Sequence, residues 1–230
     1  MQQFSHNLLC RTFETVREVV ASVRAKTVAC GKLAMYDTWA ENYDQVVTLD
    51  YHAPAIVAKT ISSHFSGDPE GAVVLDVACG TGLVMKELGF GHFVGIDGSK
   101  LMLEEAKKKG LYQDLKQCIL VQEPLPVQSG SYDVVVICGA LTVDHVAVSV
   151  IRELCHACKP GGLVCMTCRH GEDNVEYKAS LERELKEMEV EGLWSCVAVT
   201  EKEHWSKSVK AAGDIYISGS VYLTENCNTI

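Results

Sequence analysis

The sequence lacks the features of a membrane, secreted or nucleic-acid-binding protein. No apolar run approaches the roughly 18 residues that a membrane-spanning helix needs, so we expect no membrane association. Its start lacks a basic segment followed by an apolar run and a small-residue cleavage site, so we expect a cytoplasmic address, with the nucleus as the alternative. The net charge is −9 and lysine and arginine form no sustained stripe, which disfavours a nucleic-acid partner.

Cysteine is plentiful, but its pattern does not predict disulfides. Eleven cysteines, an odd number, are spread over 230 residues, which favours reduced thiols. Two C-x-x-C pairs, Cys155 with Cys158 and Cys165 with Cys168, have the spacing of a four-thiolate zinc site. They straddle a "KPGG" turn, which puts the first pair on a helix and the second on a strand, with its thiols on opposite faces. We expect no metal, and a zinc-binding module stays a minor alternative.

Helical and strand-like segments alternate along the chain, which predicts an α/β protein with a parallel, doubly wound sheet. The predicted helices cover residues 9–23, 54–65, 83–88, 100–109, 145–158 and 181–188. The predicted strands cover residues 73–77, 92–97, 118–122, 132–139, 163–168 and 214–226. We expect one structural domain, with a helical extension and cofactor lid in residues 1–69 and a cofactor-binding core in residues 70–230.

The run "LDVACGTG", Leu75 to Gly82, lies between a buried strand and the start of a helix. A glycine turn there binds either a dinucleotide or S-adenosylmethionine. The dinucleotide pattern G-x-G-x-x-G fails at Met85, which weakens the alternative of an NAD-dependent oxidoreductase. Counting back from Gly82, alternate positions instead hold a second glycine, the small Ala78 and the acidic Asp76. Small residues there let the backbone lie under the amino-acid part of the ligand.

The run "VVLDVACGTG" is similar to motif I of the class I S-adenosylmethionine-dependent methyltransferases. The runs "VGIDGSKLML", "EPLPVQSGSYDVVVICGAL" and "KPGGLV" follow in that family's order, so the resemblance covers about residues 70–170. It implies a Rossmann-like, mostly parallel sheet of seven strands with an antiparallel last strand. It also implies an enzyme that binds S-adenosylmethionine, releases S-adenosylhomocysteine and moves the methyl group by in-line displacement to an O- or N-nucleophile.

The resemblance assigns cofactor contacts residue by residue. Asp97, at the end of the second strand, is expected to accept hydrogen bonds from both ribose hydroxyls. Gly98 and Met102 are expected to line the adenine pocket. The third strand departs from the family pattern, because Leu120, Val121 and Gln122 stand where an acid often takes the adenine amino group. Gln122 is expected to substitute through its side-chain carbonyl, or Glu123 if the register is shifted. The other expected contacts are Tyr36, Trp39, Tyr43, Asp76, Ala78, Cys79, Gly80, Thr81, Gly82 and Cys138.

The run "CGALTVDH" after the fourth strand is expected to face the reaction. It lacks the N-P-P-Y form of enzymes that methylate the exocyclic amines of nucleic-acid bases. It also lacks a proline before Cys138, as found in enzymes that methylate cytosine at C5, so both reactions are disfavoured. His145 is a candidate general base, since imidazole titrates near neutrality, and Tyr43 is a second candidate. An ordinary residue at the start of a helix is the alternative for His145. Arg169, His170 and Glu172 follow the fifth strand, where they would select the substrate.

Tyr36, Trp39 and Tyr43 would share one face of a helix and form either a lid over the cofactor or a cap on the sheet. We expect a small molecule, or alternatively a protein, as the methyl acceptor, and a monomer or weak dimer. A non-catalytic protein that keeps the cofactor fold and serves as a binding partner is the remaining alternative. The intact set of Asp76, the two glycines and Asp97 argues against it.

Overall fold

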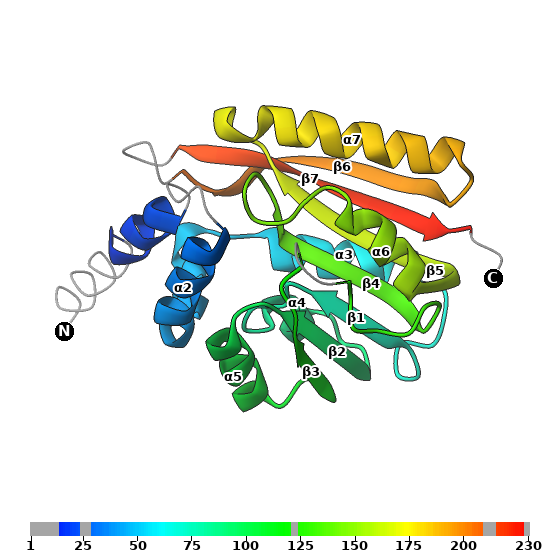
Figure 1. Ribbon diagram of the computed structural model, residues 1–230, viewed down its shortest axis with the longest axis horizontal. Helices are drawn as coiled ribbons and strands as arrows, with labels where there is room; N and C mark the ends of the chain where they lie inside the picture. Colours follow the sequence, from blue (N-terminus) through cyan, green and yellow to red (C-terminus); the bar gives the residue numbers. More distant parts are fainter. Residues whose placement is uncertain (1–13, 24–28, 121–123, 209–214, 228–230) are drawn as a thin grey trace.

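The computed structural model describes residues 14–23, 29–120, 124–208 and 215–227, and it is built around a seven-stranded sheet (Figure 1). The strands are β1 Val73–Val77, β2 His92–Asp97, β3 Asp114–Gln117, β4 Tyr132–Leu141, β5 Cys158–Arg169, β6 Trp194–Lys207 and β7 Tyr216–Asn226. Their order is β3-β2-β1-β4-β5-β7-β6, with β1 to β5 parallel and β7 antiparallel to both neighbours. The predicted fold class is confirmed.

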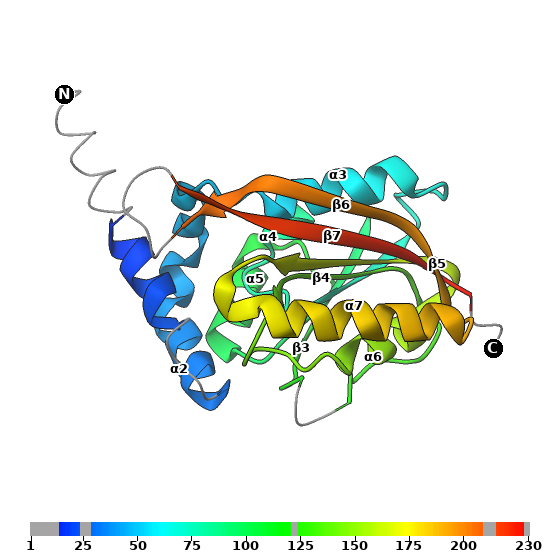
Figure 2. The same cartoon turned by 90° about the horizontal axis from the view of Figure 1, so that it is seen from above.

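Helices cover both faces of this sheet. They are α2 Ala29–Trp39, the 3-10 helix η1 Ala40–Leu49, α3 Ala53–His64, α4 Leu83–Glu87, α5 Lys100–Lys109, α6 Val150–Ala157, the short η2 Glu172–Asn174 and α7 Val175–Val190. The apolar side chains of α3 and α4 pack on one face, and those of α6 and α7 pack on the other (Figure 2). Both faces of β1 are therefore buried, which explains why all its residues except Asp76 are apolar.

The boundaries of α5 follow the predicted caps. Ser99 accepts a hydrogen bond through its hydroxyl from the Met102 amide at 3.1 Å, and Gly110 ends the helix with a left-handed φ of 67°. Three lysines in the last turn complement the helix dipole. This helix follows β2 directly, so its first turn lies beside Asp97 at the end of that strand.

Two predicted elements are corrected. Residues 118–120 of the predicted strand 118–122 lie beyond β3, which is Asp114–Gln117, and 121–123 lie outside the described residues. β3 is an edge strand that pairs only with β2, so a polar sequence suffices for it. The predicted helix 145–158 is shortened to α6, which begins at Val150. Asp144 has a left-handed φ of 58°, and the residues between it and α6 lie mostly in turns. Cys158 therefore begins β5.

The amino-terminal helices pack together beside the sheet. Residues 14–23 are helical, and their buried Val16 joins Trp39, Val46 and Leu49 in a separate apolar cluster. The predicted helix 9–23 is confirmed over 14–23, while Leu9 and Phe13 lie outside the described residues. The apolar side chains of residues 14–23 thus pack on the chain's own core in this structure.

Candidate active site

A cavity opens at the carboxyl ends of β1 to β4, where parallel strands bring their last residues to one edge of the sheet. Residues after each of these strands line it, and α2 and η1 close it from outside. The lining residues are Lys32, Leu33, Tyr36, Tyr43, Ala78, Gly80, Asp97, Gly98, Met102, Cys118, Ile119, Leu120, Cys138, Gly139, Ala140, Asp144, His145 and Val146. We call this space the cofactor cavity.

The glycine turn alternates between backbone conformations. Ala78, Gly80 and Gly82 have φ angles of 55°, 53° and 85°, so every second residue is left-handed. Glycine adopts this region without a Cβ penalty, and a small alanine carries the least side chain at the third position. The alternation turns the chain sharply out of β1 and into α4, which begins directly after Gly82. This geometry explains the spacing of small residues in the sequence.

Asp97 is held rigidly at the mouth of the cavity. Its Oδ2 accepts a hydrogen bond from the Gly80 amide and its Oδ1 accepts one from the Ser99 amide, each at 2.8 Å. Burial raises the pKa of Asp97 and these backbone bonds oppose that rise. Each carboxylate oxygen keeps a second lone pair, so the fixed carboxylate suits a vicinal diol such as ribose. Met102, which is 2% exposed, gives the same cavity an apolar wall.

Asp76 lies behind the turn and is absent from the cavity lining. Its Oδ2 accepts a hydrogen bond from the Tyr112 hydroxyl at 2.7 Å. Burial raises the pKa of Asp76 to about 7, and the Tyr112 hydrogen bond works against that rise. A Cβ on Gly82 would come within 2.8 Å of the Tyr112 ring, so this tyrosine also explains the glycine. The contacts of Asp76 are those of a residue that braces the turn, and its contact with the cofactor stays a prediction.

The aromatic run before the core folds over the cavity. The rings of Tyr36 and Tyr43 lie 6.2 Å apart, and those of Trp39 and Tyr43 lie 5.0 Å apart, both edge to face. Acidic residues of the same run tie it down. Asp37 accepts a hydrogen bond from the Ser99 hydroxyl at 2.5 Å, and Asp44 accepts one from the Thr81 hydroxyl at 2.5 Å.

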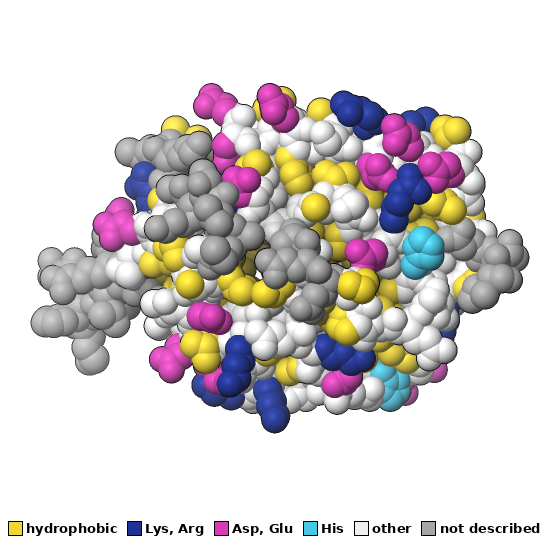
Figure 3. Space-filling view, in the orientation of Figure 1, with side chains coloured by type: hydrophobic (Ala, Val, Ile, Leu, Met, Phe, Trp, Pro, Cys, Tyr) yellow, Lys and Arg dark blue, Asp and Glu magenta, His cyan; other side chains and the backbone are white. Residues whose placement is uncertain are grey.

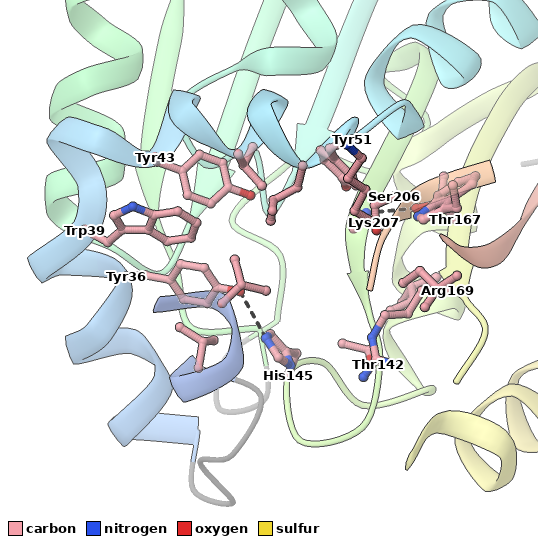
Figure 4. A pocket seen from close by; sticks show the side chains of 18 residues that line it. Tyr36, Trp39, Tyr43, Tyr51, Thr142, His145, Thr167, Arg169, Ser206 and Lys207 are labelled. Atoms are coloured by element: carbon pink, nitrogen blue, oxygen red, sulfur yellow. Dashed lines mark hydrogen bonds between the residues drawn. The ribbon is translucent and has the colours of Figure 1, made fainter. Parts of the chain in front are cut away.

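Beyond the lid aromatics lies a second hollow, which we call the acceptor chamber (Figure 4). Its described lining is mainly aromatic and aliphatic, with Arg169 and Lys207 as the charged members. It shares Tyr36, Tyr43, Gly139 and His145 with the cofactor cavity. Gly139 has a φ of 77°, and a Cβ there would overlap the Tyr51 hydroxyl. Only glycine suits this point of the shared wall.

His145 stands at the junction of the two spaces, in a turn before α6 and not at the start of a helix. Its Nε2 lies 3.1 Å from the Tyr36 hydroxyl, and its Nδ1 lies 3.2 Å from Lys32 Nζ. Lys32 is 4% exposed and also donates a hydrogen bond to the Val143 carbonyl at 3.2 Å. Burial lowers the pKa of Lys32, against the attraction of Asp144.

The other predicted site residues divide into four groups. Trp39 and Arg169 line the acceptor chamber, whereas Cys79, Thr81 and Gly82 lie outside the described lining of both spaces. Gln122 and Glu123 lie outside the described residues. His170 contacts the hydroxyls of Ser218 and Ser220 on β7, and Glu172 lies in η2.

Two candidate reactive groups stay protonated near neutral pH. Burial raises the pKa of the Cys138 thiol to about 12 and raises the pKa of the Tyr43 phenol well above its usual range. A buried thiol with this pKa is a poor nucleophile. Cys138 in the cofactor cavity and Tyr43 at the junction therefore act as neutral walls or hydrogen-bond donors, which removes support for Tyr43 as a base.

The cysteine pairs do not form a metal site in the described part of the chain. Within residues 14–23, 29–120, 124–208 and 215–227, no cluster of three or more potential metal-ligating His, Cys, Asp or Glu side chains occurs. Cys165 packs in the core on one face of the sheet and Cys168 in the core on the other. In the same described ranges, no helix has the length and apolarity needed to cross a membrane.

Comparison with known proteins agrees with this architecture. Residues 74–162 match a family described as a methyltransferase domain. The Homo sapiens protein named Methyltransferase-like protein 27 is 49% identical over 167 residues, which cover 71% of this chain and 68% of that protein. A demethylmenaquinone methyltransferase of Lactococcus lactis is 35% identical over 113 residues, or 45% of each chain. The chain thus spans under half the length of this bacterial relative.

A solved structure shares the fold. The S-adenosylmethionine-dependent methyltransferase from Thiobacillus denitrificans, in complex with S-adenosyl-L-homocysteine, has a TM-score of 0.52 and 18% identity. The match covers 76% of this chain and 93% of that one. The strand order, the glycine turn and the acid that ends β2 define a Rossmann-like methyltransferase. This chain belongs to the class I S-adenosylmethionine-dependent methyltransferases, and S-adenosylmethionine is its cofactor.

Proposed function

We propose that this enzyme methylates an O- or N-nucleophile of a small molecule bound in the acceptor chamber. The observation that carries the proposal is the wall shared by the two spaces, made of Tyr36, Tyr43, Gly139 and His145. A methyl donor in one space and an acceptor in the other would meet only there. In-line transfer needs alignment and exclusion of water more than a reactive side chain.

The residues that line the cofactor cavity have the chemistry needed to bind S-adenosylmethionine. Asp97 holds the ribose, Gly98 and Met102 line the adenine slot, and the turn residues Ala78 and Gly80 line the part of the cavity that takes the amino-acid end. Tyr36 and Tyr43 cover the cavity as parts of a lid. S-adenosylmethionine supplies a methyl group that its sulfonium already activates. The protein's share is therefore binding, orientation and handling of the acceptor's proton.

His145 is the residue to which we assign that proton. It lines both spaces, and its Nε2 lies 3.1 Å from the Tyr36 hydroxyl at the junction. A positioned histidine contributes roughly 10²- to 10⁴-fold to reactions that need a proton removed. An oxygen or nitrogen nucleophile carries such a proton, so this placement favours those acceptors.

Three observations favour a small molecule over a macromolecule. The chamber is lined by the rings of Trp39, Tyr43 and Tyr51, which suit a small apolar ligand (Figure 4). The described residues on the face in Figure 3 mix acidic with basic side chains and show no continuous basic surface for a nucleic acid. The bacterial relative named above is a demethylmenaquinone methyltransferase, which acts on a small molecule by its name. A protein side chain remains the alternative acceptor.

The finer assignments belong to the same proposal. The runs "YDTWAENYDQ", "LDVACGTGLV" and "QEPLP" resemble the methyltransferase-like protein encoded in the Williams-Beuren syndrome chromosome region, and we place the chain in that narrower group. We divide it into a lid-bearing extension, residues 1–69, and a core, residues 70–230, within one domain. We propose a cytoplasmic monomer or weak dimer, with the nucleus as a second location.

The proposal is tested with a labelled methyl donor and a fractionated cell extract. Label is expected in the extractable small-molecule fraction and not in precipitated protein. His145→Gln should lower the rate of labelling at least about 100-fold while binding S-adenosylhomocysteine within about threefold of wild type. Label confined to protein would overturn the choice of acceptor, and tight cofactor binding without any label would support the non-catalytic alternative.

A further inference from the structure

The acceptor chamber has a chemical character that selects among small molecules. Trp39, Tyr43, Tyr51 and Trp205 line it together with Val, Leu and Ile side chains. Flat aromatic walls favour a flat apolar body, because such a ligand stacks on them and displaces poorly held water. The polar groups gather at the ends, with His145 at the junction and Arg169 and Lys207 across from the lid (Figure 4).

The charged side chains that line the chamber are cations, and each forms an ion pair with a carboxylate outside the described lining. Arg169 forms a two-bond ion pair with Asp173 at 2.8 and 3.0 Å, and Lys207 Nζ lies 3.3 Å from the carboxylate of Asp50. Lys32 adds a buried amine beside His145. The described lining of the chamber holds no carboxylate that could pair with an acceptor arriving as an ammonium ion. Arg169 and Lys207 would stabilise an uncharged acceptor that develops negative charge during reaction.

The described contacts among Lys32, His145 and Tyr36 are compatible with two hydrogen-bond arrangements. With Lys32 uncharged, His145 Nδ1–H points to the Val143 carbonyl and the Lys32 amine, and Nε2 accepts from the Tyr36 hydroxyl. With Lys32 charged, its ammonium donates to Nδ1 and to the Val143 carbonyl, and Nε2–H donates to the Tyr36 oxygen. The two arrangements differ by one proton and by the direction of every bond along the row.

We propose that Tyr36, His145 and Lys32 form a proton path that ends at Lys32, and that the chamber takes an uncharged aromatic hydroxyl compound as methyl acceptor. The inference rests on the proposed methyl transfer and names its acceptor class. It also assigns a role to Lys32, a positioning residue that acts through His145 and does not touch the acceptor.

The proton balance follows the two arrangements. The acceptor's O–H bond breaks as its proton passes to the Tyr36 oxygen, and Tyr36 gives its own proton to His145 Nε2. His145 passes its Nδ1 proton to the lone pair of Lys32, which becomes an ammonium. The phenolate then accepts a hydrogen bond from the Tyr36 hydroxyl. Its oxygen forms the new bond to the methyl group as the bond from methyl to sulfur breaks. After release, Lys32 returns its proton to His145 Nδ1, and His145 gives its Nε2 proton to the Tyr36 oxygen as the Tyr36 hydroxyl proton passes to solvent, which restores the starting arrangement.

The charge state of Lys32 depends on every group that faces it. Burial favours the uncharged amine, Asp144 and Asp173 favour the ammonium, and Arg169 opposes it. On the side of the junction, Lys32 contacts His145, which in turn contacts Tyr36. Of these influences burial is the largest, so the pKa of Lys32 is lowered from its usual value.

The test uses 4-nitrophenol, whose phenolate is coloured, with protein saturated with S-adenosylhomocysteine. The bound phenol is expected to ionise at least about one pH unit below the free phenol, and no proton should reach the buffer in calorimetry across buffers of different ionisation heat. Lys32→Met should abolish the shift, whereas Lys186→Met, at an exposed lysine paired with Glu189, should leave it unchanged. His145→Gln should also abolish it.

Two matched compounds and one spectrum complete the test. 4-Nitrobenzylamine, a cation, should bind at least about tenfold more weakly than the phenol, and 4-nitroanisole, which has no proton to give, should bind without proton movement. The imidazole nitrogen signals of His145 should show the tautomer reversing as pH falls, and Lys32→Met should fix one tautomer. Tighter binding of the amine, or a full shift in Lys32→Met, would overturn the inference.

The failure of this inference is distinguishable from failure of the methyl-transfer proposal. S-adenosylhomocysteine binding, measured on the same preparations, reports the cofactor site and the folding of each variant. Cofactor binding and labelled product without the phenol shift would leave the methyl transfer standing and reject the proton path. If the cofactor does not bind, the phenol titration is run on the protein alone, where the same three residues still determine the shift.

Discussion

Thr81 donates a hydrogen bond from its hydroxyl to Asp44 Oδ1 at 2.5 Å, across 37 positions of the sequence. It joins the glycine turn to the lid segment, and the other carboxylate oxygen of Asp44 lies 2.6 Å from Lys109 Nζ on α5. Asp37 makes the equivalent link to Ser99 before α5. The acids of the run "YDTWAENYD" therefore fasten the lid, and its aromatics line the two spaces.

Asp44→Ala is expected to weaken S-adenosylhomocysteine binding about tenfold. A hydrogen bond to a charged group is worth about 1.5 to 3 kcal/mol, and the turn would lose its link to the lid. Calorimetry measures the affinity. The control is Glu41→Ala, an exposed acid on the same helix, which should bind as wild type does. Equal affinities of wild type and Asp44→Ala would show that the lid does not depend on this bond.

Asp76 should make the protein less stable as pH rises. Its pKa is about 7 in the folded protein against 3.8 ordinarily, so the folded state binds more protons between these values. The free energy of unfolding should therefore fall between about pH 4 and pH 7 by comparison with Asp76→Asn, which stays uncharged. Urea unfolding at pH 5, 6, 7 and 8 measures the difference.

Tyr112→Phe provides the control for that window. It removes the hydrogen bond that lowers the pKa of Asp76, so the decline in stability should extend to higher pH. A difference between wild type and Asp76→Asn that does not change with pH would contradict the role of burial at this carboxyl.

Cys138 should be dispensable for the chemistry. Its thiol, with a pKa raised to about 12 by burial, should resist iodoacetamide at pH 8, whereas the exposed Cys196 should react. Cys138→Ala should bind S-adenosylhomocysteine within about threefold of wild type, because the contact is only apolar. Rapid alkylation of Cys138 that blocks cofactor binding would restore a reactive thiol as a candidate.

The sequence predicted those parts of the site that lie within one local segment. The glycine turn, Asp97 and the caps of α5 each depend on a few adjacent residues, so their pattern was readable. Tyr112, Asp44 and Lys32 escaped prediction because their partners lie 36 or more positions away. A lone lysine such as Lys32 carries no signal of burial until the fold brings His145 to it.

The errors in the fold have the same origin. Hydrophobicity marked residues 118–120 as a strand, but their apolar side chains serve the end of the cofactor cavity beyond the polar edge strand β3. The predicted helix from His145 to Cys158 began too early. The left-handed conformation of Asp144 and the turns after it do not interrupt the apolar pattern, so no sign of them is visible in the sequence. Apolar character shows that a segment is buried, and the neighbouring elements decide its conformation.

The central claim is that the carboxyl ends of β1 and β2 hold S-adenosylmethionine, with Asp97 as the main anchor. Calorimetric titration of S-adenosylhomocysteine into wild type, Asp97→Asn and Asp97→Ala tests it most directly. We predict micromolar or tighter binding to wild type and a loss of at least about tenfold in both variants, because an amide cannot accept from two hydroxyls as a carboxylate does. Absence of binding to wild type, or unchanged affinity in Asp97→Asn, would contradict the account.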